Sequence, residues 1–165
     1  MGGDFEWLPA IVAVDGVWEG VPSRLYQIFE LDFKMTRRYF DSLPVWWDRT
    51  YLPGECYEEG FWHLITKNIH RTGERLFEPR RAERLPWCGP TVSNSHHQVV
   101  KVFDYREGRK RRLRTYIWLE PLDYAIILER KQMRLGRVAF LITAFYIDGE
   151  SGRRRLQRKF ENRDP

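Results

Sequence analysis

The sequence has few of the residues that cross-link a chain or bind metals. Only two of its 165 residues are cysteines and only four are histidines. Cys56 and Cys88 form no Cys-x-x-Cys pair, and the adjacent His96 and His97 have no ligand-spaced Cys or carboxylate nearby. Two lone cysteines are typical of a reducing compartment. We therefore expect no disulfide framework, no metal site and no other cofactor.

Long apolar segments and common nucleotide-binding signatures are also missing. The longest apolar runs, such as Ala139–Ile142, are far too short to cross a bilayer. Residues 1–7 lack the basic and apolar regions of a signal peptide. There is no Gly-x-x-x-x-Gly-Lys-Ser/Thr loop, no Gly-x-Gly-x-x-Gly and no Gly-x-Ser-x-Gly. These absences predict a cytoplasmic protein without a membrane partner.

Charge is distributed unevenly along the chain. Residues 1–60 have five Lys and Arg against eleven Asp and Glu, a net charge of −6, whereas residues 61–165 have twenty-three against twelve, a net charge of +11. A cationic segment of this strength attracts phosphate polymers or acidic proteins. The length suits a single domain over residues 1–165. Within it we expect an acidic N-terminal extension with a long helix (1–60) and a basic core (61–165).

Apolar spacing predicts helices in the first half of the chain and strands in the second. Pro22 opens a segment with apolar residues three and four apart that continues to Phe40, which predicts a helix over 22–41. Turn and breaker residues divide the middle of the chain. There we expect a strand over 45–51, a strand or helix over 61–67, a helix over 79–85, and loops over 68–78 and 87–95.

Four alternating segments and a basic tail complete the chain. The segments cover residues 99–105, 112–119, 123–130 and 138–147. Three short links between four strands are typical of an antiparallel meander. Residues 152–162 fit a short helix. The predicted fold class is therefore α+β, with N-terminal helices followed by a four-stranded antiparallel β-meander and a short C-terminal helix.

His63 is the first candidate for chemistry, because an imidazole titrates near neutral pH and serves as a general acid or base. If residues 61–67 are helical, Lys67 shares a face with His63 and its ammonium can neutralise a phosphate. A buried structural histidine is the alternative interpretation. The predicted strands have no second histidine, so a site with one histidine needs Tyr, Lys or Glu as its partner.

Residues of the predicted strands complete the candidate catalytic set. Thr143 can donate a hydrogen bond to a phosphate oxygen, and Arg130, beside Glu129, can add a guanidinium. Tyr146 is a candidate base, but on an extended strand it faces away from Thr143 unless a bulge intervenes. Each of these residues also has an ordinary structural use, since Thr and Tyr are good strand formers.

Basic residues concentrate in two tracts, residues 106–114 at a predicted hairpin tip and residues 153–159 in the predicted C-terminal helix. Such tracts usually contact phosphates rather than read bases. A solvated surface is the alternative interpretation. The residues expected to contact nucleic acid are Arg109, Lys110, Arg111, Arg112, Arg153, Arg154 and Arg155.

The order of these elements resembles the barnase, EndoU, colicin-type tRNase and RelE-like nucleases, in their phage and bacterial branch. The resembling segments lie within residues 60–160 and are Phe61–Thr66, Arg84–Trp87, Tyr116–Leu119 with Asp123-Tyr124, and Leu141–Tyr146. The resemblance implies a metal-independent ribonuclease. In it His63 would be the general acid or base, Lys67 or Arg130 would bind phosphate, and Thr143 would position it.

Three functions fit the sequence. The first is a metal-independent endoribonuclease, with a toxin as one role, RNA as its partner and an acidic protein such as an antitoxin as a second partner. The second is a non-catalytic module of a phage or mobile element that binds nucleic acid or protein. The third is a scaffold in such an assembly. The first requires His63, Lys67, Arg130 and Thr143 to converge in one cleft.

Overall fold

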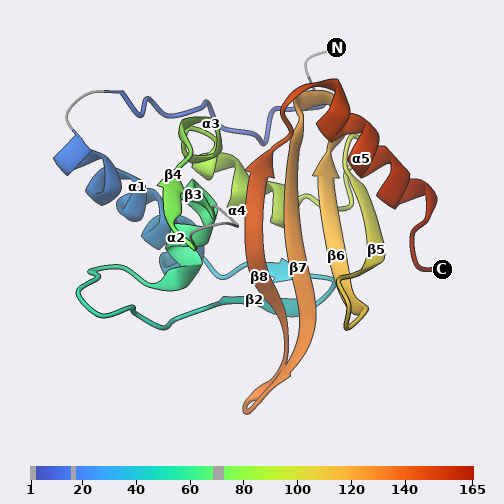
Figure 1. The fold of residues 1–165 in the computed structure, drawn as a ribbon. Coiled ribbons are helices and arrows are strands. Elements are labelled where there is room, and N and C mark those ends of the chain that lie inside the picture. The colour runs from blue at the N-terminus through green and yellow to red at the C-terminus, as the bar shows by residue number, and fades with distance from the viewer. Residues whose placement is uncertain (1–2, 16–17, 69–72) are drawn as a thin grey trace.

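The computed structural model describes residues 3–15, 18–68 and 73–165. These residues form a six-stranded sheet and a two-stranded sheet, with helices packed against both faces of the larger one (Figure 1). Helices α1 (Val21–Phe29), α2 (Glu59–Ile65) and α4 (Leu85–Ser93) cover one face, and α5 (Gly149–Glu161) crosses the other (Figure 1). The α+β character expected from the sequence is confirmed. No helix within the described ranges is long and apolar enough to cross a membrane.

The larger sheet is mixed, with strand order β1-β2-β8-β7-β6-β5. Its strands are β1 (Tyr39–Phe40), β2 (Leu43–Trp47), β5 (Lys101–Glu107), β6 (Arg112–Leu119), β7 (Tyr124–Met133) and β8 (Gly136–Tyr146). Strands β5 to β8 pair antiparallel in sequence order, whereas β2 pairs in parallel with β8, with Val45 opposite Ala139 and Trp47 opposite Leu141.

The predicted fold class, a four-stranded antiparallel meander preceded by helices, is therefore wrong. The sheet has six strands and one parallel pair, and helices and strands alternate through the first half of the chain. Strand β2 lies along the edge of β8. There Val45 and Trp47 are buried, with exposed fractions of 7% and 3%. Local alternation predicts a strand but says nothing about the remote edge to which it binds.

The helices also differ from their predicted ranges. Helix α1 (Val21–Phe29) continues as a π-helical segment, η2 (Glu30–Met35), and then ends because Thr36 is extended. Residues 36–41, which the sequence predicts to be helical, are not. The chain instead turns back at Asp41 and Ser42, which both have positive φ. Shorter helical segments are η1 (Trp18–Gly20), α2 (Glu59–Ile65), α3 (Pro79–Ala82) and η3 (Glu120–Leu122). Helix α5 is Gly149–Glu161.

Two segments predicted as loops contain regular elements, and residues 69–72 of the first lie outside the described residues. Strands β3 (Thr66–Asn68) and β4 (Arg75–Phe77) form the two-stranded sheet, and α4 (Leu85–Ser93) occupies most of residues 87–95. Helix α4 forms despite two prolines and a glycine because Leu85, Cys88 and Val92, three and four residues apart, are all buried. Tertiary burial outweighs the weak helix propensity of this segment.

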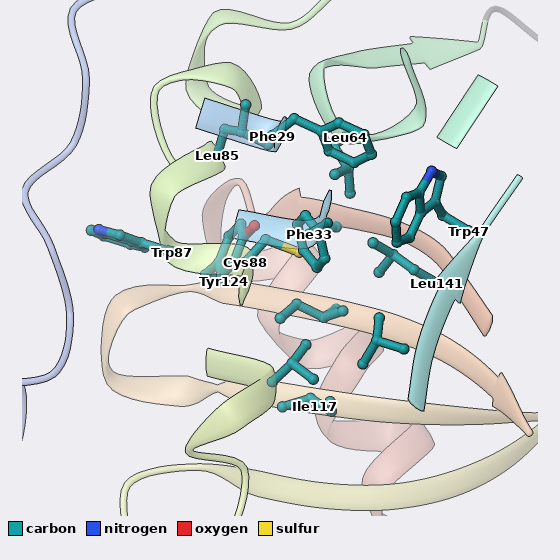
Figure 2. Close-up of a cluster of buried hydrophobic side chains, with 14 of the residues drawn as sticks. Phe29, Phe33, Trp47, Leu64, Leu85, Trp87, Cys88, Ile117, Tyr124 and Leu141 are labelled. Atoms are coloured by element: carbon teal, nitrogen blue, oxygen red, sulfur yellow. The ribbon is translucent and has the colours of Figure 1, made fainter. Parts of the chain in front are cut away.

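The main core lies between the sheet and helices α1, α2 and α4. Figure 2 shows Phe29 and Phe33 of the α1–η2 segment, Leu64 of α2 and Cys88 of α4 converging on the sheet, where Leu141 contributes from β8. A smaller core under α5 joins Phe103, Tyr116, Trp118 and Ile147 of the sheet side to Leu156. The large sheet is thus buried on both faces, and α5 is held by packing.

Candidate functional site

His63 lies on α2 in a network of charged residues. Its Nε2 is 3.5 Å from Oε2 of Glu59, one turn earlier, and Glu59 forms a two-point ion pair with Arg75 of β4. The His63 side chain is 33% exposed. Burial first, and the positive charge of Arg75 second, lower the pKa of His63, although Glu59 opposes this. The imidazole is therefore held neutral at neutral pH.

Thr143 contacts the backbone of His63 rather than its ring. The Thr143 hydroxyl donates a hydrogen bond of 2.8 Å to the His63 carbonyl oxygen. Arg81 of α3 donates to the same oxygen at 3.2 Å and to the carbonyl of Thr66. These bonds satisfy carbonyls at the C-terminal end of α2, which have no partner within the helix. They anchor α2 to β8, so the observed role of Thr143 is positioning.

Sequence reasoning missed Glu59, Arg75 and Arg81. Arg81 stands between Arg80 and Arg84 in a segment correctly expected to be a short helix, and nothing in the local pattern sets it apart. The pairing of Glu59 with Arg75 joins residues sixteen apart across the α2–β4 packing. Only the helical spacing of Glu59 and His63, four residues apart, was a signal that the sequence carried.

Lys67 and Arg130 each pair with carboxylates other than Glu59, the carboxylate beside the His63 ring. Lys67 extends from β3 and pairs with Glu78 at 3.1 Å. Arg130 of β7 pairs with Asp104 at 3.2 Å and with Asp41 at 3.3 Å. Arg130 is three residues beyond the β7 partner of Thr143, about 10 Å along the strand. Of the four residues expected to form one cleft, Thr143 is hydrogen-bonded to the backbone of His63, whereas Arg130 lies farther along the sheet and pairs with Asp104.

Tyr146 lies at the end of β8, apart from Thr143. The register between β7 and β8 shifts at Ile127 and Leu128, which makes Ile142 the extra residue of a bulge. This bulge precedes Thr143, so Thr143 and Tyr146 still face opposite sides of the strand. The Tyr146 ring lies against the guanidinium of Arg84, 4.3 Å from its centroid.

The two basic tracts meet at Glu107, the last residue of β5. The ammonium of Lys159 on α5 and the hydroxyl of Tyr116 on β6 both donate to Glu107 Oε1, and Lys159 Nζ is 2.8 Å from the Tyr116 oxygen. Burial tends to raise the pKa of Glu107, but the bonds from Lys159 and Tyr116 outweigh it and the pKa is lowered. This carboxylate therefore stays ionised and links α5 to the β5–β6 hairpin.

Two adjoining hollows share Glu107 in their walls. The first, here called the α5 cleft, has a volume of about 430 Å³. Its walls are residues of the sheet and of α5: Glu107, Tyr116, Ile127, Phe145, Tyr146, Ile147, Asp148, Ser151, Gly152, Arg155, Leu156 and Lys159. The second, of about 340 Å³, lies at the hairpin tip and is lined by Glu107, Gly108, Arg109, Lys110, Arg112 and Arg114. His63, Lys67, Arg130 and Thr143 line neither hollow.

Ion pairing divides the predicted nucleic-acid-binding residues into two groups. Arg153 pairs with Asp123 at 2.8 Å and with Glu150 at 2.6 Å. Together with Arg154 it lines a separate hollow of about 480 Å³ beside Trp118. The remaining predicted residues form no ion pair within the part of the chain that the structure describes: Arg109, Lys110, Arg111, Arg112, Arg154 and Arg155.

Helix geometry separates the arginines of the second tract in a different way, by the hollow that each one lines. Successive residues of an α-helix are rotated by about 100°, so residues four apart share a face. Arg155 and Lys159 therefore face the α5 cleft together, whereas Arg153 and Arg154 face the hollow beside Trp118. A run of arginines in the sequence is thus two surfaces in the folded protein.

Comparison with protein-family models, curated proteins and solved structures finds no match to this chain. Among the residues with described positions, no group of three or more His, Cys, Asp or Glu side chains is arranged to hold a metal ion. Cys56 is an exposed free thiol and Cys88 a buried one. The candidate site is therefore defined by the cations and aromatic rings around Glu107.

Proposed function

We propose that the protein binds single-stranded RNA across the hairpin tip and the α5 cleft. The observation that carries this proposal is the meeting of the two basic tracts at Glu107. Arg109, Lys110, Arg112 and Arg155 border adjoining hollows and have no carboxylate partner among the described residues. Cations without partners on a concave surface attract a phosphate backbone.

Aromatic side chains in the α5 cleft support a single-stranded ligand. Phe145 belongs to the small core under α5, is partly exposed and lines the same hollow as Arg155, whereas the Tyr146 ring lies against Arg84. Unpaired bases stack on such rings, each contributing about 1–3 kcal/mol, whereas paired bases in a duplex do not present their faces. The choice of RNA over DNA is part of the proposal, and it follows the sequence resemblance of segments within residues 60–160 to the barnase and RelE-like ribonucleases.

A binding experiment tests this proposal. Fluorescence anisotropy of a labelled single-stranded RNA, measured at several salt concentrations, reports affinity and its salt slope. We expect the triple variant Arg109→Ala, Lys110→Ala, Arg112→Ala to bind more weakly, with a slope reduced by about 0.7 for each phosphate that is no longer neutralised. Arg155→Ala should weaken binding in the same direction.

The matched control removes positive charge elsewhere. Arg134 and Arg137, at the β7–β8 turn, are exposed and form no ion pair within the described part of the chain. Replacing both with Ala, together with the exposed Lys131 so that three charges are removed as in the triple variant, should leave the affinity close to that of the wild type. An equal loss in the control would show that net charge alone attracts RNA, and an unchanged affinity in the triple variant would remove the hairpin tip from the interface.

Metal-independent RNA cleavage is a second candidate, favoured by Glu107. This carboxylate has a lowered pKa, lies in the α5 cleft and contacts Lys159. It can accept the proton of a ribose 2′-hydroxyl whose oxygen attacks the adjacent phosphorus. The bond from phosphorus to the 5′-oxygen then breaks, Lys159 supplies a proton to that oxygen, and a 2′,3′-cyclic phosphate remains. Arg155 would stabilise the charge developing on the phosphate.

Cleavage is tested with purified protein and RNA in the presence of EDTA. We expect product strands ending in 2′,3′-cyclic phosphate, and a rate lowered about 10²–10⁴-fold in Glu107→Gln, the usual range for loss of a general base. His63→Gln is the contrasting variant and should leave the rate unchanged, since His63 does not line the cleft. If the wild type does not cleave RNA, the cleavage proposal fails and only the proposal of RNA binding stands.

A further inference from the structure

The acidic first sixty residues gather their few cations in one place. Four of their five Lys and Arg residues line a hollow of about 780 Å³ between η2 and β2. We call it the Arg49 hollow. Its lining is Phe33, Lys34, Arg37, Arg38, Tyr39, Pro44, Val45, Trp46, Trp47, Arg49, Tyr51 and Glu58. It shares no residue with the α5 cleft.

Two of these four cations are already neutralised. Lys34 pairs with Glu58 at 2.9 Å. Arg38 donates to the backbone carbonyl of Asp32 at 2.7 Å and contacts the Asp32 carboxylate at 3.3 Å. Arg37 and Arg49 are exposed and have no ion-pair partner in the described ranges. The hollow therefore presents about two uncompensated positive charges.

A buried carboxylate fixes one wall of the hollow. The Glu58 side chain is 2% exposed and accepts hydrogen bonds from Tyr26 at 2.8 Å and from Tyr51 at 3.1 Å. Burial opposes ionisation of this group, but Lys34 and Tyr26 together lower the pKa of Glu58. Glu58 is thus ionised, and its ion-pair partner is Lys34.

Arg49 is held flat against aromatic rings. Its guanidinium carbon lies 3.4 Å from the ring centroid of Trp46 and 4.3 Å from that of Trp47. A stacked guanidinium keeps its edge N–H groups available for a planar or tetrahedral anion. Tyr39 and Tyr51, which also line the hollow, are 52% and 53% exposed. Exposed rings beside a preorganised guanidinium suit a ligand with a flat ring and an anionic group.

We propose that the Arg49 hollow binds a nucleoside 5′-monophosphate, either free or as the 5′-terminal nucleotide of a strand. Arg37 and Arg49 would bind the phosphate, and Tyr39 or Tyr51 would stack on the base. A phosphomonoester carries a charge of about −1.5 to −2 at pH 7, which matches two guanidiniums better than the single charge of an internal phosphodiester. The volume lies within the usual range of small-molecule sites, about 300–1,000 Å³.

Quenching of the tryptophan fluorescence of the protein, to which Trp46 and Trp47 in the hollow contribute, provides the test. The wild type is titrated with adenosine 5′-monophosphate, adenosine and inorganic phosphate, and binding is confirmed by calorimetry. We expect the monophosphate to bind at least tenfold more tightly than either fragment. Arg37→Ala should weaken it about tenfold, and so should Arg49→Lys, which keeps the charge but loses the bidentate stacked group.

Arg24→Ala is the matched control, since Arg24 is an exposed arginine of α1 that does not line the hollow. It should bind the monophosphate as the wild type does. Absence of binding at millimolar ligand, or an equal loss in Arg24→Ala, would overturn the proposal. Equal affinity for inorganic phosphate and for the monophosphate would overturn recognition of the ring.

The two sources of the ligand are separated with oligonucleotides. A short RNA with a 5′-phosphate is compared with the same RNA carrying a 5′-hydroxyl, in the background of the triple hairpin-tip variant. Tighter binding of the 5′-phosphate form, abolished in Arg49→Lys, would assign the hollow to strand ends. Binding of the free monophosphate without that preference would assign it to free nucleotides. Because both readouts compare ligands that differ in the 5′-phosphate or in the ring, a failure here is distinct from a failure of RNA binding at the α5 cleft.

Discussion

At the scale of single residues, ion pairing decides which cations are available to a ligand. Lys67, Arg130 and Arg153 each face a carboxylate within 3.3 Å, so their charges are largely neutralised within the fold. Arg155 and Arg49 face none among the described residues and line hollows instead. Residue type alone does not separate the paired cations from the unpaired ones. The contacts of each guanidinium or ammonium separate them.

The first prediction concerns the pH dependence set by His63. Its pKa is lowered in the folded protein but ordinary, about 6.5, in the unfolded chain. Between these two values the unfolded chain binds more protons, so the free energy of unfolding falls as the pH is lowered through this window and is fully restored above it. We expect His63→Gln, which binds no proton, to show a shallower dependence.

Urea unfolding between pH 5 and pH 8 measures this effect, and the other histidines contribute equally to both proteins. A variant whose unfolding free energy changes with pH as steeply as that of the wild type would contradict the environment described for His63.

The second prediction concerns the hydrogen bond from Thr143 to the carbonyl of His63. Thr143→Val keeps the shape and β-branching of the side chain but removes the donor. We expect a loss of about 1 kcal/mol in the free energy of unfolding, the usual net value of one hydrogen bond. Thr143→Ser keeps the hydroxyl, so it should retain the hydrogen bond and lose only the packing of one methyl group. Equal stability of the valine variant and the wild type would show that Arg81 alone satisfies this carbonyl.

At the scale of elements, close contacts between neighbours override local preference. Helix α4 contains Pro86, Gly89 and Pro90, a composition typical of a loop, yet it is helical because one of its faces is buried against the core. The long helix expected over 22–41 is shorter because residues 39–47 are drawn into β1 and β2. In both cases a contact with a remote segment decides the state.

The third prediction tests the close approach of Gly89 to Arg38. A Cβ at this position would lie 2.5 Å from Nε of Arg38, whose guanidinium is fixed by Asp32 and Ser93. Alanine normally stabilises a helix by about 1 kcal/mol relative to glycine. We expect Gly89→Ala to destabilise the protein instead, because it displaces Arg38 from these partners. Thermal unfolding measures the change.

A double variant supplies the control for this clash. In an Arg38→Ala background the clash is absent, and Gly89→Ala should then be neutral or stabilising. The same destabilisation in both backgrounds would mean that the backbone of α4, and not Arg38, requires the glycine.

At the scale of the whole molecule, the acidic N-terminal segment is part of the folded core. Phe29, Phe33 and Trp47 from this segment pack against Leu64 and Leu141 from the basic remainder (Figure 2). Strand β2 also covers part of the edge of β8. The opposite net charges of the two segments therefore meet within one structure rather than on separable parts.

The fourth prediction concerns this shared core. A chain of residues 61–165 alone should not unfold cooperatively, because it loses β1, β2 and the aromatic side chains that cover the sheet. Each buried large apolar side chain contributes about 1.5–3 kcal/mol, and the loss of several is comparable to the whole stability of a typical domain, about 5–15 kcal/mol. Circular dichroism during thermal unfolding compares the fragment with the full chain. A cooperative transition in the fragment would restore the interpretation of residues 1–60 as an extension.

The sequence by itself determined the features that depend on neighbours along the chain. Alternation located β5 to β8 to within a few residues, helical spacing located the start of α1, and the run from Arg153 to Lys159 located α5. These patterns are readable because side-chain direction repeats every two residues in a strand and every 3.6 in a helix. The charge asymmetry is likewise a property of the chain alone.

Only the tertiary structure decided the site. The parallel pairing of β2 with β8, the separation of Arg130 from His63 and the meeting of two basic tracts at Glu107 all join residues far apart in the sequence. The hollow around Arg49 likewise assembles the cations of an otherwise acidic segment. Such contacts depend on which surfaces are buried together. The free energy of that burial depends on both of the remote segments that meet, and the periodicity of either segment alone does not reveal its partner.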